Sequence, residues 1–442
     1  MADFSPWTLF TDIGIIAALL LIGQIMRAKL KIVQKYFIPP SLMAGFIGLI
    51  FGPGGLKWLP LSDNMGVYAS ILIALIFACL PFSSSNSKSS KSDIGKMWAY
   101  SQGGMLMQWA FGGLLGLLVL RLFWPVSDAF GISMPCGYCG GHGTAAAVGQ
   151  AFSQMGDDDM MTLAMTAATV GIVSSVFLGM TLIKWATKRG YTSFLATFEN
   201  LPHELRTGLL PEDKRESVGQ CTSSSISIDT IALNFCVLIL VALCGYGISK
   251  GVAFFIPKLE MPVFSCAFIA GILLKFILRK AKAIDYICPK TVGHLSGAFT
   301  DFLVAFGISA IKLEIVLKYI VPLVILLASG IIATMFYVLF VGRRMMKNEF
   351  WFEKALFTWG WFSGTMATGI ALLRIADPKM KSHCLEDYAL AYLFIAPVEI
   401  SLITFAPMAF VYGYGLYFSL IVLVLFLIIL GFSIKKGWLK SK

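Results

Sequence analysis

Two glycine-rich interruptions, one in each half of the sequence, constrain its fold more than any other feature. The first is Cys-Gly-Tyr-Cys-Gly-Gly-His-Gly-Thr-Ala-Ala-Ala at residues 136–147, and the second is Trp-Phe-Ser-Gly-Thr-Met-Ala-Thr-Gly at residues 361–369. Both lie in apolar sequence long enough to enter a membrane. Because a bilayer core offers no water to backbone N–H and C=O groups, irregular backbone there must be buried in protein or line a wet cavity. Two such breaks in corresponding places indicate a transport site built from inverted repeats.

The composition predicts a polytopic membrane protein. Apolar residues make up 57% of the chain and charged residues only 13%, which excludes an ordinary soluble enzyme. The net charge of +11 does not indicate a nucleic-acid partner, because the basic residues lie in short loops beside apolar segments. That pattern is typical of proteins oriented in a lipid bilayer.

Hydropathy predicts eleven membrane-spanning helices, since a span needs roughly 17–25 mostly apolar residues. The predicted spans cover residues 7–26, 38–58, 66–82, 97–123, 159–187, 228–251, 262–279, 296–313, 319–341, 386–412 and 415–434. Two further segments, 131–155 and 352–376, contain the glycine-rich breaks. We predict that both are re-entrant hairpins, which enter and leave the membrane on the same side.

The distribution of basic residues favours this topology. With the N-terminus outside and both hairpins re-entrant, 28 of the 35 Lys and Arg residues fall in cytoplasmic connections. The acidic run at residues 157–159 then falls outside. If either hairpin crossed the membrane, every later loop would change sides; for the first hairpin these loops include the clusters at 279–282 and 343–344, which would then violate the positive-inside rule.

The number and order of the predicted spans indicate an internal repeat. Each half gives five spans with a hairpin between the fourth and fifth, and an odd number of spans inverts the second unit. The predicted fold is therefore all-α, with two inverted five-span repeats and one extra C-terminal span. The expected organisation is a first repeat at 1–187, a cytoplasmic linker at 188–227, a second repeat at 228–412, and an extra span with a basic cytoplasmic tail at 413–442. Residues 83–93 are expected to form a flexible inner loop.

The first break is a candidate substrate site. Gly140, Gly141 and Gly143 let backbone groups approach a ligand closely, and Thr144 adds a hydroxyl; His142 lies among them. The sequence that follows predicts a helix, whose N-terminus suits a carboxylate. Close packing between membrane helices is the alternative interpretation of these small residues.

The second break predicts a substrate and ion site of the same design. Ser363, Gly364 and Thr365 are candidate substrate-binding residues, and Thr365 and Thr368 are candidate sodium ligands. Hydroxyl and carbonyl oxygens at a broken helix are hard ligands that suit this ion.

Charged residues within predicted spans are functional candidates, because they are costly to insert into a membrane. Asp301 and Glu399 are candidate cation or proton ligands. Arg374, shortly after the second break, is either a clamp for a substrate carboxylate or an anchor at the inner surface. Asp12 and Asp229 lie near span ends and are interpreted as helix caps.

The cysteines do not indicate a metal centre or a catalytic site. Cys136, Cys139 and His142 give only three ligands, whereas structural zinc needs four. An intramembrane hydrolase using Cys139 and His142 is an alternative, but no orienting acid is evident nearby. We therefore do not predict an enzyme.

The first break, Gly140-Gly141-His142-Gly143-Thr144 with the helix to Phe152, closely resembles the first hairpin motif of the glutamate:sodium symporter family. Residues 168–172, Ala-Thr-Val-Gly-Ile, also resemble that family. The resemblance implies Na⁺-coupled uptake of glutamate by a homodimer, with a static scaffold and a mobile domain holding both hairpins. The related 2-hydroxycarboxylate symporters share a glycine pair in each hairpin, and here Ser363-Gly364-Thr365 departs from that pair.

We therefore expect a secondary transporter of the bacterial inner membrane that carries glutamate or a similar acidic amino acid inward with Na⁺. The N-terminus is expected outside and the C-terminus in the cytoplasm, with sodium as the transported ion and no organic cofactor. A cation/proton antiporter using Asp301 and Glu399 is the alternative. The choice between glutamate and a related dicarboxylate stays open.

Overall fold

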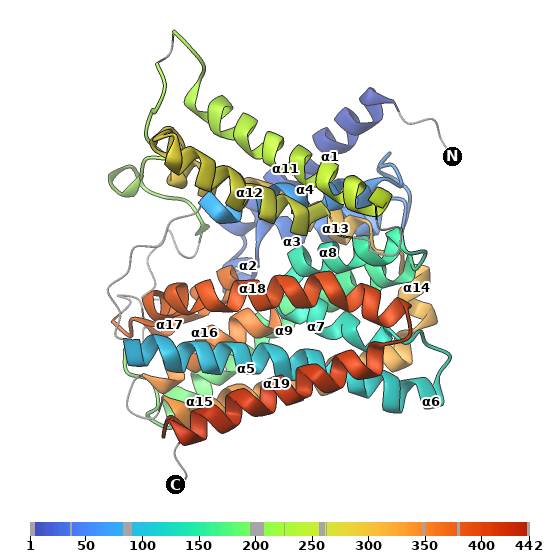
Figure 1. Ribbon diagram of the computed structural model, residues 1–442, viewed down its shortest axis with the longest axis vertical. Coiled ribbons are helices and arrows are strands. Elements are labelled where there is room, and N and C mark those ends of the chain that lie inside the picture. Colours follow the sequence, from blue (N-terminus) through green and yellow to red (C-terminus); the bar gives the residue numbers. More distant parts are fainter. Residues whose placement is uncertain are drawn as a thin grey trace. The chain divides into compact units, whose positions relative to one another are not determined.

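The computed structural model describes residues 5–35, 38–82, 91–194, 207–224, 226–255, 261, 263–346, 350–377 and 381–439. Within these residues the regular secondary structure is helical and no strand occurs (Figure 1), so the predicted all-α class is confirmed. Most of the predicted inner loop, residues 83–90, lies outside the described residues. So do residues 195–206 of the predicted linker.

Nine helices among the described residues are long and apolar enough to cross a membrane. They are α1 (Pro6–Lys29), α4 with its 3-10 extension (Met65–Phe82), α5 with its extension (Asp93–Phe123), α9 (Asp159–Lys188), α11 (Thr230–Phe255), α13 (Pro289–Ser309), α15 (Ile320–Met345), α18 (Cys384–Val411) and α19 (Gly415–Lys435). Each overlaps a predicted span, although α13 begins seven residues before the predicted boundary at 296. The chain is thus a polytopic membrane protein.

The remaining two predicted spans correspond to shorter or more charged helices. α3 (Pro40–Phe51) has 12 residues and ends seven residues before the predicted boundary. The sequence Gly-Pro-Gly-Gly at 52–55 explains this end, because proline and glycine interrupt helices. α12 (Val263–Lys280) has 18 residues and carries Arg279 and Lys280 in its last turn.

Both glycine-rich segments form pairs of short helices. α7 (Ser133–Tyr138) and α8 (Gly141–Gln154) flank the first break, and α16 (Trp351–Ser363) and α17 (Met366–Ala376) flank the second. These helices have between 6 and 14 residues. Each is shorter than the roughly 20 residues that a helix needs to cross a bilayer.

The chain forms two compact units, and each unit draws on both halves of the sequence. Unit 1 comprises Met1–Gly23, Pro40–Asn86 and Leu210–Ala310. Unit 2 comprises Gln24–Pro39, Ser87–Leu209 and Ile311–Lys442, and it contains both broken helix pairs.

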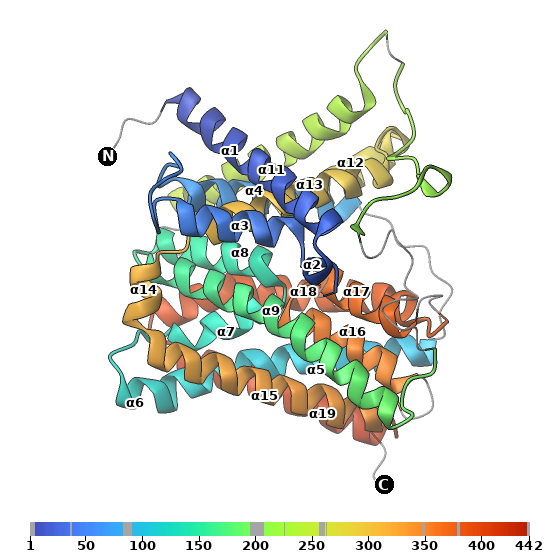
Figure 2. The ribbon, with the colours of Figure 1, turned by 180° about the vertical axis from the view of Figure 1, so that it is seen from behind.

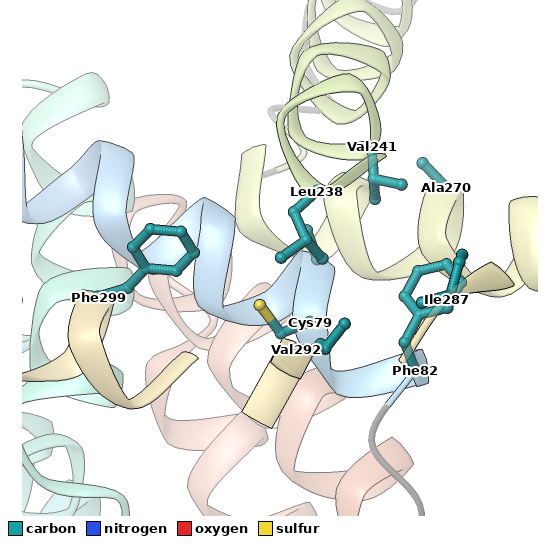
Figure 3. Close-up of a cluster of buried hydrophobic side chains, with 9 residues drawn as sticks. Cys79, Phe82, Leu238, Val241, Ala270, Ile287, Val292 and Phe299 are labelled. Carbon is teal, nitrogen blue, oxygen red and sulfur yellow. The ribbon is translucent and has the colours of Figure 1, made fainter. Parts of the chain in front are cut away.

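Unit 1 contains most of α1 together with α3, α4, α11, α12 and α13. Its apolar core lies where α4, α11, α12 and α13 meet (Figure 3); the cluster consists of Ala78, Cys79, Phe82, Leu238, Val241, Ala270, Ile287, Val292 and Phe299. Small residues let these helices approach closely, as is common between membrane helices. A β-carbon built on Gly245 of α11 would lie 2.5 Å from Ala267 Cα of α12.

Of the two carboxylates in unit 1 expected to cap helices, one does so and the other does not. Asp229 is a cap, because its Oδ1 accepts hydrogen bonds from the backbone N–H groups of Ile231 and Ala232. Asp12 is not a cap, and that prediction is wrong. Its buried carboxylate accepts hydrogen bonds from the Ser62 N–H and hydroxyl and from the Tyr68 hydroxyl, so it joins α1 to the beginning of α4.

Unit 2 is organised around α5 (Lys91–Leu115) and α9. α5 lies alongside α15, α18 and α19 (Figures 1 and 2), and α9 packs against α7, α8, α16 and α17. A π-helical turn (Gly116–Leu120) joins α5 to α6 (Arg121–Phe123). There the backbone of Gly131, just before α7, approaches α5, and a β-carbon on Gly131 would lie 2.1 Å from the Gly112 carbonyl oxygen.

Candidate functional site

The first break is a short left-handed segment between α7 and α8. Gly140 has φ 101° and Gly141 has φ 63°. Residues other than glycine adopt such conformations only at a cost, because their Cβ crowds the backbone. The pair of glycines therefore turns the chain sharply between the two helices and leaves the N–H groups of the first turn of α8 without intrahelical partners.

The two breaks contact each other within unit 2. A β-carbon built on Gly141 would lie 2.7 Å from Thr365 Cγ2 and 2.9 Å from the Gly364 carbonyl oxygen. No side chain fits at position 141 without displacing the second break. The structure therefore brings together the two segments that the sequence singled out.

α9 contacts both breaks from one side. The buried His142 Nε2 lies 3.0 Å from Thr169 Oγ1 on α9. Because the Thr169 hydroxyl already donates to the Met165 carbonyl, its oxygen accepts the hydrogen bond from His142. A β-carbon on Gly171 would lie 2.4 Å from the Ser363 carbonyl oxygen at the second break. His142 thus fixes α8 against α9, and its Nε2 faces the protein interior.

A capping box stabilises the second break. The Thr365 hydroxyl accepts a hydrogen bond from the Thr368 N–H (3.3 Å), and the Thr368 hydroxyl accepts one from the Thr365 N–H (2.8 Å). Thr368 also donates to the Thr365 carbonyl at 2.9 Å. These reciprocal bonds satisfy N–H groups at the beginning of α17. The two predicted sodium ligands therefore also hold the backbone of the break in place.

The end of α16 is held from α5. Gln108 Nε2 donates to the Phe362 carbonyl oxygen at 2.8 Å and to Thr334 Oγ1 of α15 at 2.7 Å. The Ser363 hydroxyl donates to the Trp359 carbonyl at 2.6 Å within α16. Sequence reasoning missed Gln108; the only signal is that it and Gln102 are amide side chains in the apolar span 97–123.

Glu399 of α18 lies at the first break. The residue is only 8% exposed, and its Oε2 accepts a hydrogen bond from the Tyr392 hydroxyl at 3.1 Å. Its Oε1 lies 3.4 Å from the position that a β-carbon on Gly140 would occupy, and Thr144 Oγ1 faces the same point from α8. The structure thus places one predicted intramembrane carboxylate beside the predicted substrate segment.

Comparison with known families identifies the family of the chain. The family model of the sodium/glutamate symporters matches residues 8–375, which includes both breaks and most of the helices. The chain belongs to the sodium/glutamate symporter family. It is accordingly a membrane transporter and not an enzyme. No curated protein matches the chain.

Two other residues predicted for the symporter site are not part of either break. Arg374 is exposed in the last turn of α17, nine residues beyond Thr365, which corresponds to about 13 Å along a helix. Asp301 belongs to α13 of unit 1. Their roles as a carboxylate clamp and a sodium ligand stay predictions.

The three residues weighed as a metal or thiol site are all buried. Among the described residues, no group of three or more His, Cys, Asp or Glu side chains is arranged to hold a metal ion. The nitrogen of His142 that makes a hydrogen bond pairs with Thr169 rather than with the thiol of Cys139. The structure therefore does not favour a zinc site or a nucleophilic cysteine.

A buried ion pair joins α16 to α18. Lys354 Nζ of α16 lies 2.9 Å from Asp387 Oδ2 of α18, and both side chains are buried. The neighbouring Glu353 accepts a hydrogen bond from the Ser193 N–H at 2.6 Å. Sequence reasoning assigned Lys354 to a cytoplasmic loop and overlooked the pair, because nothing in the local sequence indicates that the two charges meet.

Proposed function

We propose that this symporter imports glutamate or a similar acidic amino acid together with Na⁺. One observation carries the proposal: the two helix breaks contact each other, and a buried carboxylate lies beside the first. Transport sites made of broken helices place helix N-termini toward anionic groups and freed carbonyl oxygens toward cations. The carboxylates of glutamate suit the helix N-termini, and Na⁺ suits the freed carbonyl oxygens.

In this proposal the substrate carboxylate binds at the N-terminus of α8. The unpaired N–H groups of Gly141 and Gly143 and the Thr144 hydroxyl donate to it, and the helix dipole favours its charge. His142 keeps the first turn of α8 in place through Thr169. Arg374 is proposed to attract or clamp the second carboxylate.

Sodium is proposed to bind at the second break, to oxygens of Ser363, Gly364, Thr365 and Thr368. Asp301 and Glu399 are the further candidate ligands for a cation. The capping box supports coupling, because an ion that uses the free lone pairs of the two threonine hydroxyls also orders the backbone against which Gly141 packs. Such coupling requires each ligand to raise the affinity of the other.

The proposed mechanism is alternating access by unit 2, which carries both hairpins, against unit 1 as a scaffold. The short helices on either side of each break support re-entrance, and the order of spans supports two inverted repeats at 1–187 and 228–412, joined by the linker 188–227. Location in the bacterial inner membrane, an external N-terminus, a cytoplasmic C-terminus and assembly as a homodimer belong to the same proposal.

The alternatives are less well supported. An antiporter that uses Asp301 and Glu399 is less well supported than a symporter because the chain matches the sodium/glutamate symporter family. A hydrolase needs His142 to serve Cys139, whereas its Nε2 is hydrogen-bonded to Thr169. Both hypotheses also leave the contact between the two breaks without a purpose.

Uptake by the purified protein in liposomes tests the proposal. An inward Na⁺ gradient is expected to drive accumulation of labelled glutamate, and an equal K⁺ or choline gradient is not. A proton gradient imposed without Na⁺ serves as the control for coupling of glutamate uptake to protons. Uptake that follows the proton gradient and ignores Na⁺ would contradict the proposal.

A further inference from the structure

The carboxylate of Glu399 has no cationic partner in the described parts of the chain. No Lys, Arg or His side chain in those parts forms an ion pair with it. The ionisable groups near it are Tyr392 and Tyr388 on its own helix and Cys139 at the first break, none of them basic. A buried carboxylate in such surroundings is costly unless a cation or a proton compensates it.

The buried Lys354–Asp387 pair gives a contrast on the same helix. Asp387 lies three turns before Glu399 on α18, and there the chain supplies its own ammonium group at 2.9 Å. The chain thus neutralises one buried carboxylate of α18 internally. It leaves the other, at the break, to be neutralised from outside.

The two oxygens of Glu399 have different surroundings. Oε2 accepts the hydrogen bond from Tyr392, which fixes the carboxylate plane. Oε1 faces Gly140 and Thr144, at the beginning of α8, and makes no hydrogen bond within the described residues. A ligand held at the N-terminus of α8 therefore lies next to Oε1.

An α-amino acid carries its ammonium group on the same carbon as its α-carboxylate. A site that binds the carboxylate at the N-terminus of α8 must therefore neutralise a positive charge immediately beside it. We propose that Glu399 binds the substrate's α-ammonium group and so makes this transporter select amino acids over dicarboxylates that lack an amine. This inference rests on the proposed function and extends it to substrate class.

Glutarate is the matched probe, because it has the carbon chain and both carboxylates of glutamate but no ammonium group. In the wild-type protein, binding in saturating Na⁺ is expected to be far weaker for glutarate than for glutamate. A site built to bind a polar substrate group discriminates strongly against an analogue without it, since its own buried group is then left unpaired.

The variant Glu399→Gln keeps the shape and removes the charge. We expect it to bind glutamate about 10- to 100-fold more weakly, the effect of losing a hydrogen bond between charged groups, and to bind glutarate as well as the wild type or better. The ratio of the two affinities is the decisive measurement. Glu386→Gln, at the exposed beginning of the same helix, is the matched control and should leave the ratio unchanged.

Three outcomes would overturn the inference. If the wild-type protein binds glutarate and glutamate equally, the site needs no partner for an ammonium group. This measurement uses no variant, so it does not depend on whether a variant folds. Equal losses for both ligands in Glu399→Gln, recovered at high Na⁺, would make Glu399 a sodium ligand. Loss of pH dependence with an unchanged affinity ratio would make it a proton site. Failure of the wild type to bind either ligand would instead contradict the proposed function.

Discussion

At the scale of single residues, Gly141 shows why the first break tolerates so little change. Its positive φ and its contact with Gly364 and Thr365 exclude any side chain for two independent reasons. The sequence predicted the close approach from the glycines alone. It did not indicate that the neighbouring group would be the second break, which is 223 residues away along the chain.

Replacing Gly141 by valine is therefore expected to abolish glutamate binding while the protein still inserts into the membrane. A β-branched residue in a left-handed conformation costs about 1–2 kcal/mol, before its contact with Thr365 is counted. Calorimetry and gel filtration in detergent measure binding and integrity separately. Gly431→Val, in α19 with open space around its α-carbon, is the control. Normal binding by Gly141→Val would favour helix packing as the purpose of these glycines.

The capping threonines allow a distinction between structure and ion binding. Thr365→Ala and Thr368→Ala each remove a cap, which costs about 1 kcal/mol, whereas Thr365→Ser keeps the hydroxyl. If the hydroxyls also bind Na⁺, both alanine variants should need more Na⁺ for half-maximal glutamate binding, and saturating Na⁺ should restore much of the affinity. An unchanged Na⁺ dependence in both would leave capping as their only role.

Asp157, in the connection between α8 and α9, makes the stability of the fold depend on pH. Burial raises the pKa of Asp157, and the neighbouring Asp159 and Asp158 add to the rise, against backbone N–H groups of Met160 and Asp159 that lower it. The folded protein therefore holds this proton to a higher pH than the unfolded chain, and ionisation weakens the fold.

Asp157→Asn should consequently raise the melting temperature at neutral pH, and the gain should shrink as the pH falls below the pKa of the folded carboxyl group. Thermal unfolding in detergent between pH 4 and pH 8 measures this. The exposed Asp213→Asn is the control. If the gain in melting temperature instead grew toward acid pH, the pKa of Asp157 would not be raised in the folded protein.

At the scale of helices, the sequence predicted most of the architecture, because length and hydropathy suffice to identify a membrane-spanning helix. The chief error was α3, which ends at Phe51 because Gly52 and Pro53 follow. The partners of polar side chains could not be predicted. Gln108 holds the Phe362 carbonyl, and Lys354 pairs with Asp387, through contacts that exist only once distant helices have packed.

Re-entrance of the two hairpins is a prediction about helix pairs. A cysteine at Asp158, after α8, should react with an impermeant maleimide added outside intact cells, whereas one at Lys381, after α17, should react only after permeabilisation. Serine replacements of the exposed Cys221, Cys236 and Cys244 remove background labelling. Labelling of both positions from one side would contradict the two-hairpin topology and with it the inverted repeat.

At the scale of the whole molecule, the two units predict which cross-links the transport cycle tolerates. α5 and α19 both belong to unit 2, and a β-carbon on Gly113 would lie 3.2 Å from Ser419 Cβ, close to the roughly 3.5–4.5 Å of a disulfide. The double variant Gly113→Cys/Ser419→Cys should therefore form a disulfide and still accumulate glutamate in liposomes, because both helices move together.

The control for this cross-link is the same protein after reduction, and the loss of free thiols reports that the disulfide has formed. Uptake that stops on oxidation and returns on reduction would show that α5 and α19 move apart during transport. Alternating access by unit 2 as one body would then be wrong.

The interleaving of the two units has a consequence for synthesis at the ribosome. Unit 1 begins with the first helix but is completed only when α13 has been made, and unit 2 awaits α18 and α19. The first break is therefore made more than 200 residues before Glu399. A ribosome that stalls before α18 therefore leaves a chain in which neither unit 2 nor the surroundings of the first break are complete.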